Sequence, residues 1–284
     1  MYLMDNFFSY RSCFKSFTFL LLILISTCLN SQVIRKVMVL HSPPPFTFQF
    51  NLHYNEGIGQ MGGTYNADFQ SEDFINGRTF GATKGLGFDI VAKYQIDDMG
   101  HFRITASSMF NRMNSYLFKS KTTISDRGNS RFDIYTFGAG FENNFTPNHR
   151  IKLYLGLQPV ISIIKGHANL WVFNPERTPN NQQLDSIYSV SIKTGIRIGA
   201  SLTGGFEYVV GNGIGVNIGF NLLDANLLLK SSEDSGDPYN INLDDEDAPS
   251  MNMYAGRKSI VVLSVTAGIS FYLGVDTKRY VLAP

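Results

Sequence analysis

The chain has 284 residues, a formal net charge of +1, 13% aromatic residues, 17% charged residues and two cysteines. This length suits one large domain or two small ones, and the balanced charge gives no support to a nucleic-acid partner. No stretch after the N-terminus holds about 18 consecutive apolar residues, which excludes a bundle of membrane-spanning helices.

The N-terminus has the order of a secretory signal peptide. Basic residues precede the apolar run 17–25, and small and polar residues follow it. We expect residues 1–31 to be removed; an uncleaved anchor is the alternative, although about nine apolar residues are too few to span a bilayer. Both cysteines, Cys13 and Cys28, fall in this segment. The mature chain is therefore expected to have no disulfide and no thiolate metal site.

Residues 32–45 end in three consecutive prolines, which cannot join a sheet, and they predict a linker. Beyond the linker, alternation of apolar and polar residues predicts strands, because successive side chains of a strand point to opposite faces. The expected strands cover 46–57, 86–95, 102–116, 132–145, 150–164, 188–208, 214–222 and 259–274. Pro159 requires a bulge or an unpaired position in the fifth of them.

The stretch 188–202 shows the alternation most clearly. One parity is mainly apolar and consists of Val190, Ile192, Thr194, Ile196, Ile198, Ala200 and Leu202. The other is small or polar and consists of Ser191, Lys193, Gly195, Arg197, Gly199 and Ser201. Such a segment suits a strand that crosses a bilayer, with its apolar face toward lipid and its polar face toward a lumen.

The connections between the expected strands alternate in length. Compact turns near Asp97, Pro147 and Asn212 alternate with long polar connections at 58–84, 118–131, 165–186 and 230–257. This is the plan of an all-β, eight-stranded antiparallel up-and-down transmembrane β-barrel, with ten strands as the alternative. The short turns and both termini are then expected in the periplasm. Aromatic girdles are expected at the rims, with Phe46, Tyr94, Phe102, Phe145, Tyr208 and Tyr272 on the short-turn side.

The polar parity predicts a charged lumen. Its ionisable residues are Asp89, Lys93, Arg103, Glu142, Lys152, Lys193, Arg197 and Glu207. An eight-stranded barrel is just wide enough for side chains to fill, and unpaired buried charge is costly. We therefore expect a lumen charge network that packs the interior, with a narrow ion path as the alternative.

No catalytic, metal or cofactor site is expected. Only His167 and His53 could lie near the outer rim, and neither accompanies a nucleophile motif or a metal-type histidine pair. The connection 230–257 is acidic, and oxygen ligands at this density could hold a divalent cation, but their spacing matches no calcium-binding loop.

The chain resembles the small eight-stranded outer-membrane barrels of Gram-negative bacteria, of the OmpA and OmpX type, and the porin-family outer-membrane β-barrel domains. The resemblance covers about residues 46–274 and includes the last strand, Ser-Val-Thr-Ala-Gly-Ile-Ser-Phe-Tyr-Leu, at 264–273. It differs in that residues 275–284 follow as a tail, whereas the family's last strand commonly ends the chain on an aromatic residue. We expect no peptidoglycan-binding domain after the barrel, so an anchoring role like that of full-length OmpA is not implied.

This resemblance implies an integral protein of the bacterial outer membrane. Its implied partners are outer-membrane lipid and lipopolysaccharide, the barrel-assembly machinery during insertion, and an extracellular ligand that the sequence does not identify; a monomer is expected. The favoured hypothesis is a non-enzymatic barrel whose long loops have structural, adhesion or binding roles. The alternatives are a narrow porin for small solutes or ions and a lipid A-modifying enzyme.

Overall fold

The computed structural model describes residues 39–41, 44–62, 79–115, 127–172, 186–211, 213–230, 237, 240–243, 258–274 and 277–279. The expected signal peptide lies outside these residues. The chain divides into two units, one of residues 41–276 and one of residues 1–40 with 277–284. β1 (Val39–His41) and β11 (Thr277–Arg279) form a separate two-stranded sheet. Among the described residues, no helix has the length and apolar character needed to cross a membrane.

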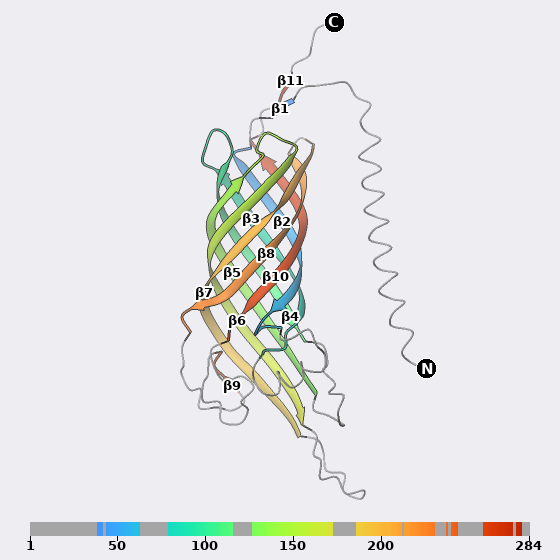
Figure 1. The fold of residues 1–284 in the computed structure, drawn as a ribbon, viewed down its shortest axis with the longest axis vertical. Helices are drawn as coiled ribbons and strands as arrows, with labels where there is room; N and C mark the ends of the chain where they lie inside the picture. The colour runs from blue at the N-terminus through green and yellow to red at the C-terminus, as the bar shows by residue number, and fades with distance from the viewer. Residues whose placement is uncertain are drawn as a thin grey trace, which may run out of the picture. The chain divides into compact units, whose positions relative to one another are not determined.

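Eight long antiparallel strands form a closed barrel (Figure 1). They are β2 (Phe46–Ile58), β3 (Lys84–Gln95), β4 (Phe102–Asn114), β5 (Arg127–Asn144), β6 (Ile151–Val172), β7 (Ser186–Gly211), β8 (Ile214–Leu228) and β10 (Val261–Leu273). Each strand pairs with the next along the chain, and β10 closes the barrel by pairing with β2 over thirteen residue pairs, from Val261 with Ile58 to Leu273 with Phe46. The predicted fold class and strand number are confirmed, and ten strands are excluded.

Side chains alternate between an apolar exterior and a polar interior over most of the barrel. In β2, Leu52 is 73% exposed and Phe50 49% exposed, whereas Thr47 and Gln49 are 1% and 2% exposed. The same alternation follows through β3, β4, β8 and β10. A soluble barrel would have the opposite pattern, because its apolar side chains would fill the inside. This inversion is the pattern of a barrel whose outer surface meets lipid.

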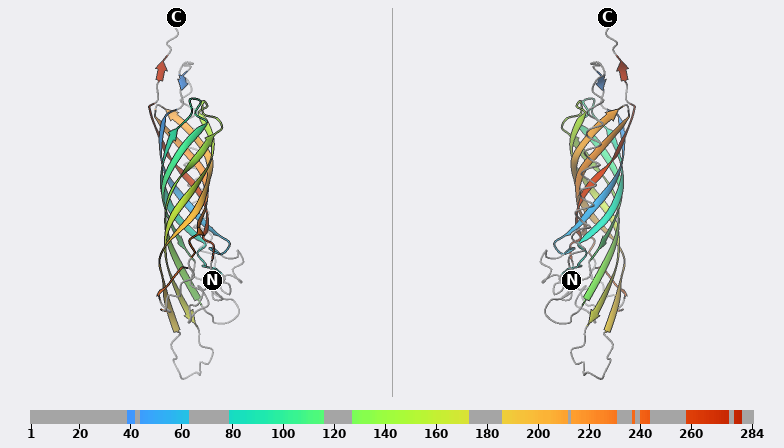
Figure 2. Two further views of the ribbon diagram at one scale, coloured as in Figure 1. Left: turned by 90° about the vertical axis from the view of Figure 1, so that its left-hand side faces the viewer. Right: turned by 90° about the vertical axis from the view of Figure 1, so that its right-hand side faces the viewer.

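Three neighbouring strands are longer than the other five, and β8 also continues six residues beyond its predicted end at residue 222. β5, β6 and β7 have 18, 22 and 26 residues, whereas the other five long strands have 12 to 15. The connections predicted at 118–131 and 165–186 are therefore partly strand. The extra residues continue beyond the ends of β4 and β8 at the long-loop end of the barrel, as Figures 1 and 2 show. A short strand, β9 (Asn240–Ile241), pairs in parallel with β7 there.

Pro159 occupies an interrupted part of the ladder between β5 and β6. Pairs on either side, Gly138 with Val160 and Phe141 with Leu157, keep the same register, and the two pairs between them are missing. Proline has no N–H to donate to that ladder. Pro159 still lies opposite Ala200 of β7 on its other side. The strand therefore accommodates proline at an unpaired position, without a bulge.

A bulge in β7 overturns the unbroken alternation predicted for 188–202. The register moves from Ile164 opposite Gly195 to Gly166 opposite Ile192, so β7 has one residue more than β6 between these pairs. An extra residue exchanges the two faces of a strand. As a result Ile192 is 4% exposed and points inward, whereas Ile196 is 57% exposed and faces outward as predicted.

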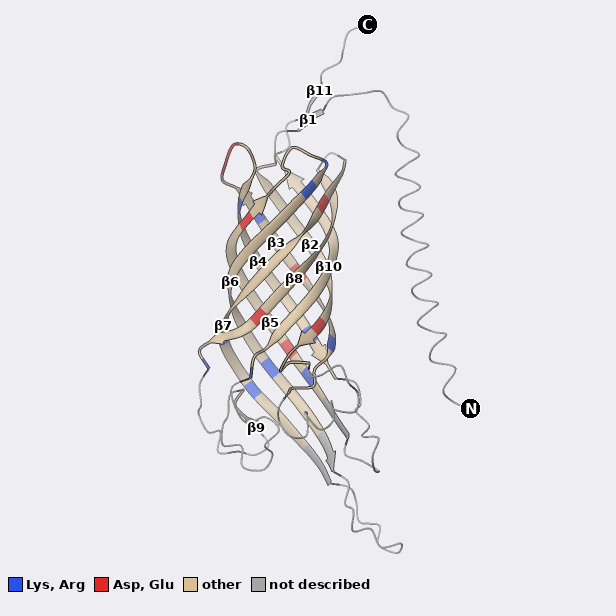
Figure 3. Ribbon diagram, in the orientation of Figure 1, with Lys and Arg blue, Asp and Glu red and all other residues tan. Residues whose placement is uncertain are grey.

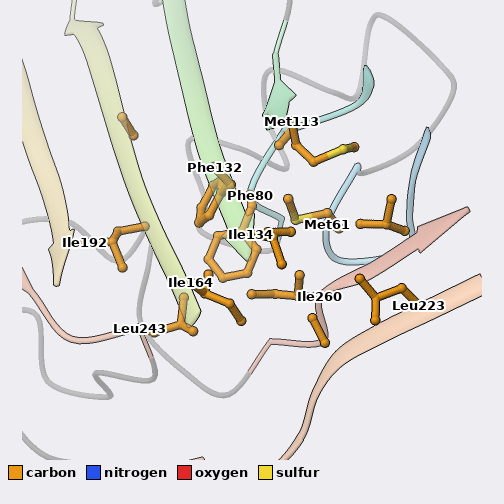
Figure 4. Packing of buried hydrophobic residues seen from close by; sticks show 14 of the residues in the cluster. Met61, Phe80, Met113, Phe132, Ile134, Ile164, Ile192, Leu223, Leu243 and Ile260 are labelled. Atoms are coloured by element: carbon orange, nitrogen blue, oxygen red, sulfur yellow. The ribbon is translucent and has the colours of Figure 1, made fainter. Parts of the chain in front are cut away.

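The interior becomes apolar at the long-loop end, although the alternation predicted a polar interior throughout. Seventeen buried apolar residues form one cluster, to which the strands and the segments beside the long loops both contribute (Figure 4). They are Met61, Phe80, Ala82, Met109, Met113, Phe132, Ile134, Val160, Ile164, Ala168, Val190, Ile192, Leu223, Ala225, Leu243, Ile260 and Val262. The rings of Phe80 and Phe132 meet at 4.8 Å between centroids. We call this set the apolar stopper.

The segments beside the long loops are held to the stopper by hydrogen bonds. The Asn226 side chain donates to the Lys258 carbonyl at 2.6 Å and accepts from the Ile260 N–H at 2.7 Å. The Ser130 hydroxyl donates to the Phe80 carbonyl at 2.6 Å. Because buried backbone groups need partners, these bonds allow loop segments to enter the barrel mouth.

The short turn between β3 and β4 is ordered by Asp97. Its carboxylate accepts the backbone N–H groups of His101 and Phe102 at 3.0 and 2.7 Å. Burial alone would raise the pKa of the Asp97 carboxyl, but these hydrogen bonds outweigh it, and the pKa lies below its ordinary value.

Candidate functional site

The centre of the short-turn half of the lumen is a cluster of two cations and two carboxylates. Lys93 Nζ lies 2.7 Å from Glu142 Oε2 and 2.7 Å from Glu207 Oε1. Arg103 Nη1 lies 3.0 Å from Glu142 Oε1 and 3.1 Å from Glu207 Oε1. All four side chains are at most 2% exposed. They come from β3, β4, β5 and β7, so the charges link opposite sides of the barrel. We call these four residues the charge quartet.

Uncharged groups complete the surroundings of Glu207. Gln49 Nε2 donates to its Oε1 at 2.9 Å, and the Tyr272 hydroxyl lies 3.4 Å from its Oε2. Lys93 Nζ lies 4.0 Å from the centroid of the Tyr154 ring. The prediction of Tyr272 as a girdle residue is wrong: it lies on the inward parity and is 5% exposed. At the same rim, the rings of Phe46 and Tyr94 meet at 4.8 Å on the outside.

A second polar group lies nearer the long loops, around His53 and Asp89. His53 Nε2 is 2.9 Å from Asp89 Oδ2, and its Nδ1 is 3.3 Å from Asn111 Oδ1. Asn51 Nδ2 donates to Asp89 Oδ1 at 2.6 Å, and Asn55 Nδ2 donates to Asn111 Oδ1 at 2.9 Å. A buried carboxylate is thus supported by an imidazole and an amide, as buried polar groups require.

The structure brings four of the eight predicted lumen residues together in the charge quartet. Asp89 belongs to the second polar group, and Lys152 is buried with its Nζ 5.3 Å from the Tyr272 ring centroid. Arg197 is 7% exposed and donates to the carbonyl of Ile196 at 2.8 Å. Lys193 lies in the β7 bulge and is only half-buried, because the bulge removes it from the inward parity.

Two participants were missing from the predicted set because they carry no charge: Tyr154 and Tyr272. Each lies on the inward parity of its strand, so the alternation itself was the signal that would have found them. Selecting only ionisable residues from that parity lost them.

The interior leaves little free space. A cavity of about 30 Å³ lies between the charge quartet and the second polar group, and it is lined by Lys93, Glu142, Asp89 and Asn51 among others. This volume has room for a few water molecules at most. Asn51 Oδ1 is buried with no hydrogen-bond partner.

The other predicted candidates for chemistry do not converge on the lumen. His167 is exposed on the outward face of β6, with Nε2 3.5 Å from the Ser189 hydroxyl. A catalytic triad of serine, histidine and carboxylate also needs a carboxylate that orients the histidine, and no contact between His167 and a carboxylate is seen among the described residues. Groups of three or more potential metal ligands are also lacking among the described residues. Most of the acidic connection 230–257 lies outside them.

A closed antiparallel barrel of eight strands, apolar outside and charged inside, has the architecture of a small transmembrane β-barrel of the outer-membrane type. No protein-family model matches the chain, and no curated protein matches it.

Solved structures of outer-membrane barrels are similar to it. Neisserial surface protein A is 15% identical with a TM-score of 0.40, and the match covers 81% of this chain and 97% of that one. The outer membrane protein OprG from Pseudomonas aeruginosa is 10% identical with a TM-score of 0.41, covering 81% and 96%. The attachment invasion locus protein Ail of Yersinia pestis is 10% identical with a TM-score of 0.34, covering 79% and 98%.

Proposed function

We propose that the chain is an integral outer-membrane barrel that neither conducts nor catalyses, and that its long-loop end has a binding, adhesion or structural role at the cell surface. The observation that carries this proposal is the filled interior. Along the barrel axis, the charge quartet, the second polar group and the apolar stopper follow one another, and a cavity of about 30 Å³ lies between the first two.

The filling argues against the narrow-porin alternative. A conducting lumen needs a continuous wet path, whereas the quartet is held by contacts at 2.7 to 3.1 Å. The stopper adds a second closure, because its buried members exclude water from the opposite end. An ion would have to break paired charges and then cross an apolar region, both of which are costly.

The three extended strands support a role at the long-loop end. β6 continues from about residue 165 to Val172, with β5 and β7 paired on either side. At about 3.3 Å per residue this is roughly 25 Å of additional strand. Such an extension is unnecessary for crossing a membrane, and it would place the loops at its ends well outside the lipid.

Conductance is the direct test of the closed interior. The purified full chain, reconstituted in planar bilayers, should give no unitary current steps at protein concentrations where a known porin gives many. Regular steps from the wild-type chain would overturn the proposal, and their loss in a variant with a larger inward side chain at Thr105 would favour the porin.

Location is tested separately. The chain should fractionate with outer membranes, migrate faster on gels before heating than after, and resist carbonate extraction. Protease added to whole cells should cleave within the long connections and leave the short turns intact. Extraction by carbonate alone, or cleavage at the Asp97 turn in intact cells, would contradict the location or the orientation.

The enzyme alternative makes a different prediction. A lipid A-modifying hydrolase that uses His167 would give an altered lipid A mass spectrum in cells that express the chain, and His167→Ala would reverse it. We expect the wild-type chain and the variant to leave identical spectra.

A further inference from the structure

The outward face of β4, β5 and β6 changes character at one level. Two aligned rows, identified from the strand register, show the change. The last apolar row consists of Phe110, Tyr135 and Ile163. The next row toward the long loops consists of Arg112, Asp133 and Lys165, and the row after that contains Arg131. In Figure 3, Lys and Arg segments recur on the long strands at this end of the barrel.

This change lies where a lipid headgroup would be. On β6, outward apolar residues run from Ile151, beside the short turn, to Ile163. That is about 12 residues, or roughly 30 Å of height at a strand tilt of about 40°. An outer-membrane barrel has an apolar band of about 25 Å. The row that contains Lys165 therefore comes immediately beyond the hydrocarbon.

The inward face supports the same boundary. From the level of Tyr135 toward the short turns, the inward neighbours on β5 are polar or small, such as Thr136 and Gly138. Closer to the long loops, the inward residues Phe132 and Ile134 are 0% exposed within the apolar stopper. On β5, apolar groups thus change from outside to inside at the level where the charged row begins.

The cations Arg112, Arg131 and Lys165 of these rows lie next to one another and remain accessible. Asp133 accepts Arg112 Nε at 2.7 Å and Nη2 at 3.3 Å, and Arg131 Nη2 lies 3.5 Å from its Oδ2. Arg112 and Arg131 side chains are still 42% and 50% exposed. Lys165 Nζ lies 5.9 Å from the Tyr135 ring centroid, beside the last apolar row.

We propose that Arg112, Arg131 and Lys165 bind the phosphate of a phosphorylated lipid headgroup in the outer leaflet. The three cations outnumber the single carboxylate of Asp133, which leaves a local charge of about +2. Guanidinium groups match phosphate oxygens in fork geometry, and the lysine adds a point charge. Acyl chains of the same lipid would lie on Phe110 and Tyr135. This inference rests on the proposed outer-membrane location.

The test uses the full chain, purified in mild detergent and reconstituted in nanodiscs of neutral phospholipid. The probe is bisphosphorylated lipid A, with the dephosphorylated glycolipid as the matched ligand. Binding to the wild type should depend on the phosphates and should survive millimolar inorganic phosphate, which distinguishes a lipid headgroup from a free phosphate site. Competition by inorganic phosphate at equal affinity would overturn the lipid assignment.

The triple variant Arg112→Gln, Arg131→Gln, Lys165→Gln should bind lipid A at least tenfold more weakly. Arg150→Gln, an exposed arginine at the opposite end of the barrel, is the matched control and should bind like the wild type. Equal binding by the triple variant, or equal loss in the control, would refute the site. Heat-modifiable migration of each variant shows that it is folded. If the chain fractionates with outer membranes but the triple variant binds lipid A as well as the wild type does, this inference alone is refuted. If the chain is absent from outer membranes, the proposed function is refuted.

Discussion

Glu207 should be the most sensitive single position in the barrel. Its side chain is 0% exposed, and its carboxylate receives Lys93 at 2.7 Å, Arg103 at 3.1 Å and Gln49 at 2.9 Å. Glu207→Gln keeps the shape but removes one of the two negative charges that neutralise the two cations. It also places an amide N–H group near Arg103, whose Nη1 donates to both carboxylate oxygens of Glu207 and cannot accept a hydrogen bond. Removing one partner of a buried ion pair costs about 3–5 kcal/mol. Two charge-assisted contacts at about 1.5–3 kcal/mol each give a similar sum.

The assay is equilibrium unfolding in urea after refolding into detergent micelles, followed by tryptophan fluorescence and by heat-modifiable migration. Asp98→Asn, an exposed carboxylate in the short turn beside β3, makes the same chemical change and should cost within about 0.5 kcal/mol. In the double variant with Lys93→Met, loss of the unpaired cation should recover part of the penalty, so the effects should not add. A Glu207→Gln variant within about 1 kcal/mol of the wild type, or strict additivity with Lys93→Met, would refute the reasoning.

Three further outcomes are expected. The pKa of the Asp97 carboxyl is lowered in the folded state, so its stabilisation is present above the unfolded pKa of about 4 and is lost as the pH falls through the folded pKa. Asp97→Asn should therefore weaken the fall of the urea midpoint below about pH 4; an unchanged acid dependence would contradict this. Phe80→Ala empties a position at 1% exposure against Phe132 and should cost about 3–5 kcal/mol, measured in the same assay; a cost below about 1 kcal/mol would show that the stopper is not tightly packed. Introduced cysteines test the β7 bulge: Ser191→Cys should react with a membrane-impermeant maleimide and Ile192→Cys should not, whereas unbroken alternation predicts the reverse.

Much of the barrel could be predicted because its central strands face two different environments. Where lipid lies outside and packed polar groups lie inside, the alternation is unambiguous, as in Phe50 beside Gln49 and Asn51. Lys93 and Glu207 could be assigned to the lumen on the same basis. Their partners could not, because contacts such as Lys93 with both carboxylates depend on how strands far apart in sequence face each other across the barrel.

The ends of β5, β6 and β7 were missed because the alternation weakens there. Beyond the lipid, at the long-loop end, the outer face of the barrel is polar and its interior is apolar. A sequence such as that of residues 127–131 therefore has the composition of a polar connection. The register was also hidden in β7. Ile192 and Ile196 share a parity in the sequence, and the single extra residue between them shows no compositional mark.

The position of that bulge has a physical reason. It lies opposite Lys165, at the level where the charged row begins on the outside. On the short-turn side of this level, a strand should have apolar side chains on its outward face. On the long-loop side, the apolar stopper requires apolar side chains on the inward face. β5 meets both demands by changing which parity is apolar, between Tyr135 and Ile134. β7 keeps one apolar parity throughout and changes its direction with one extra residue, which turns Ile192 into the stopper and leaves Ile196 facing lipid. Deleting Thr194 should therefore be far more disruptive than a substitution there, since it would turn the Ile192 side outward and place Ser191 among the stopper residues.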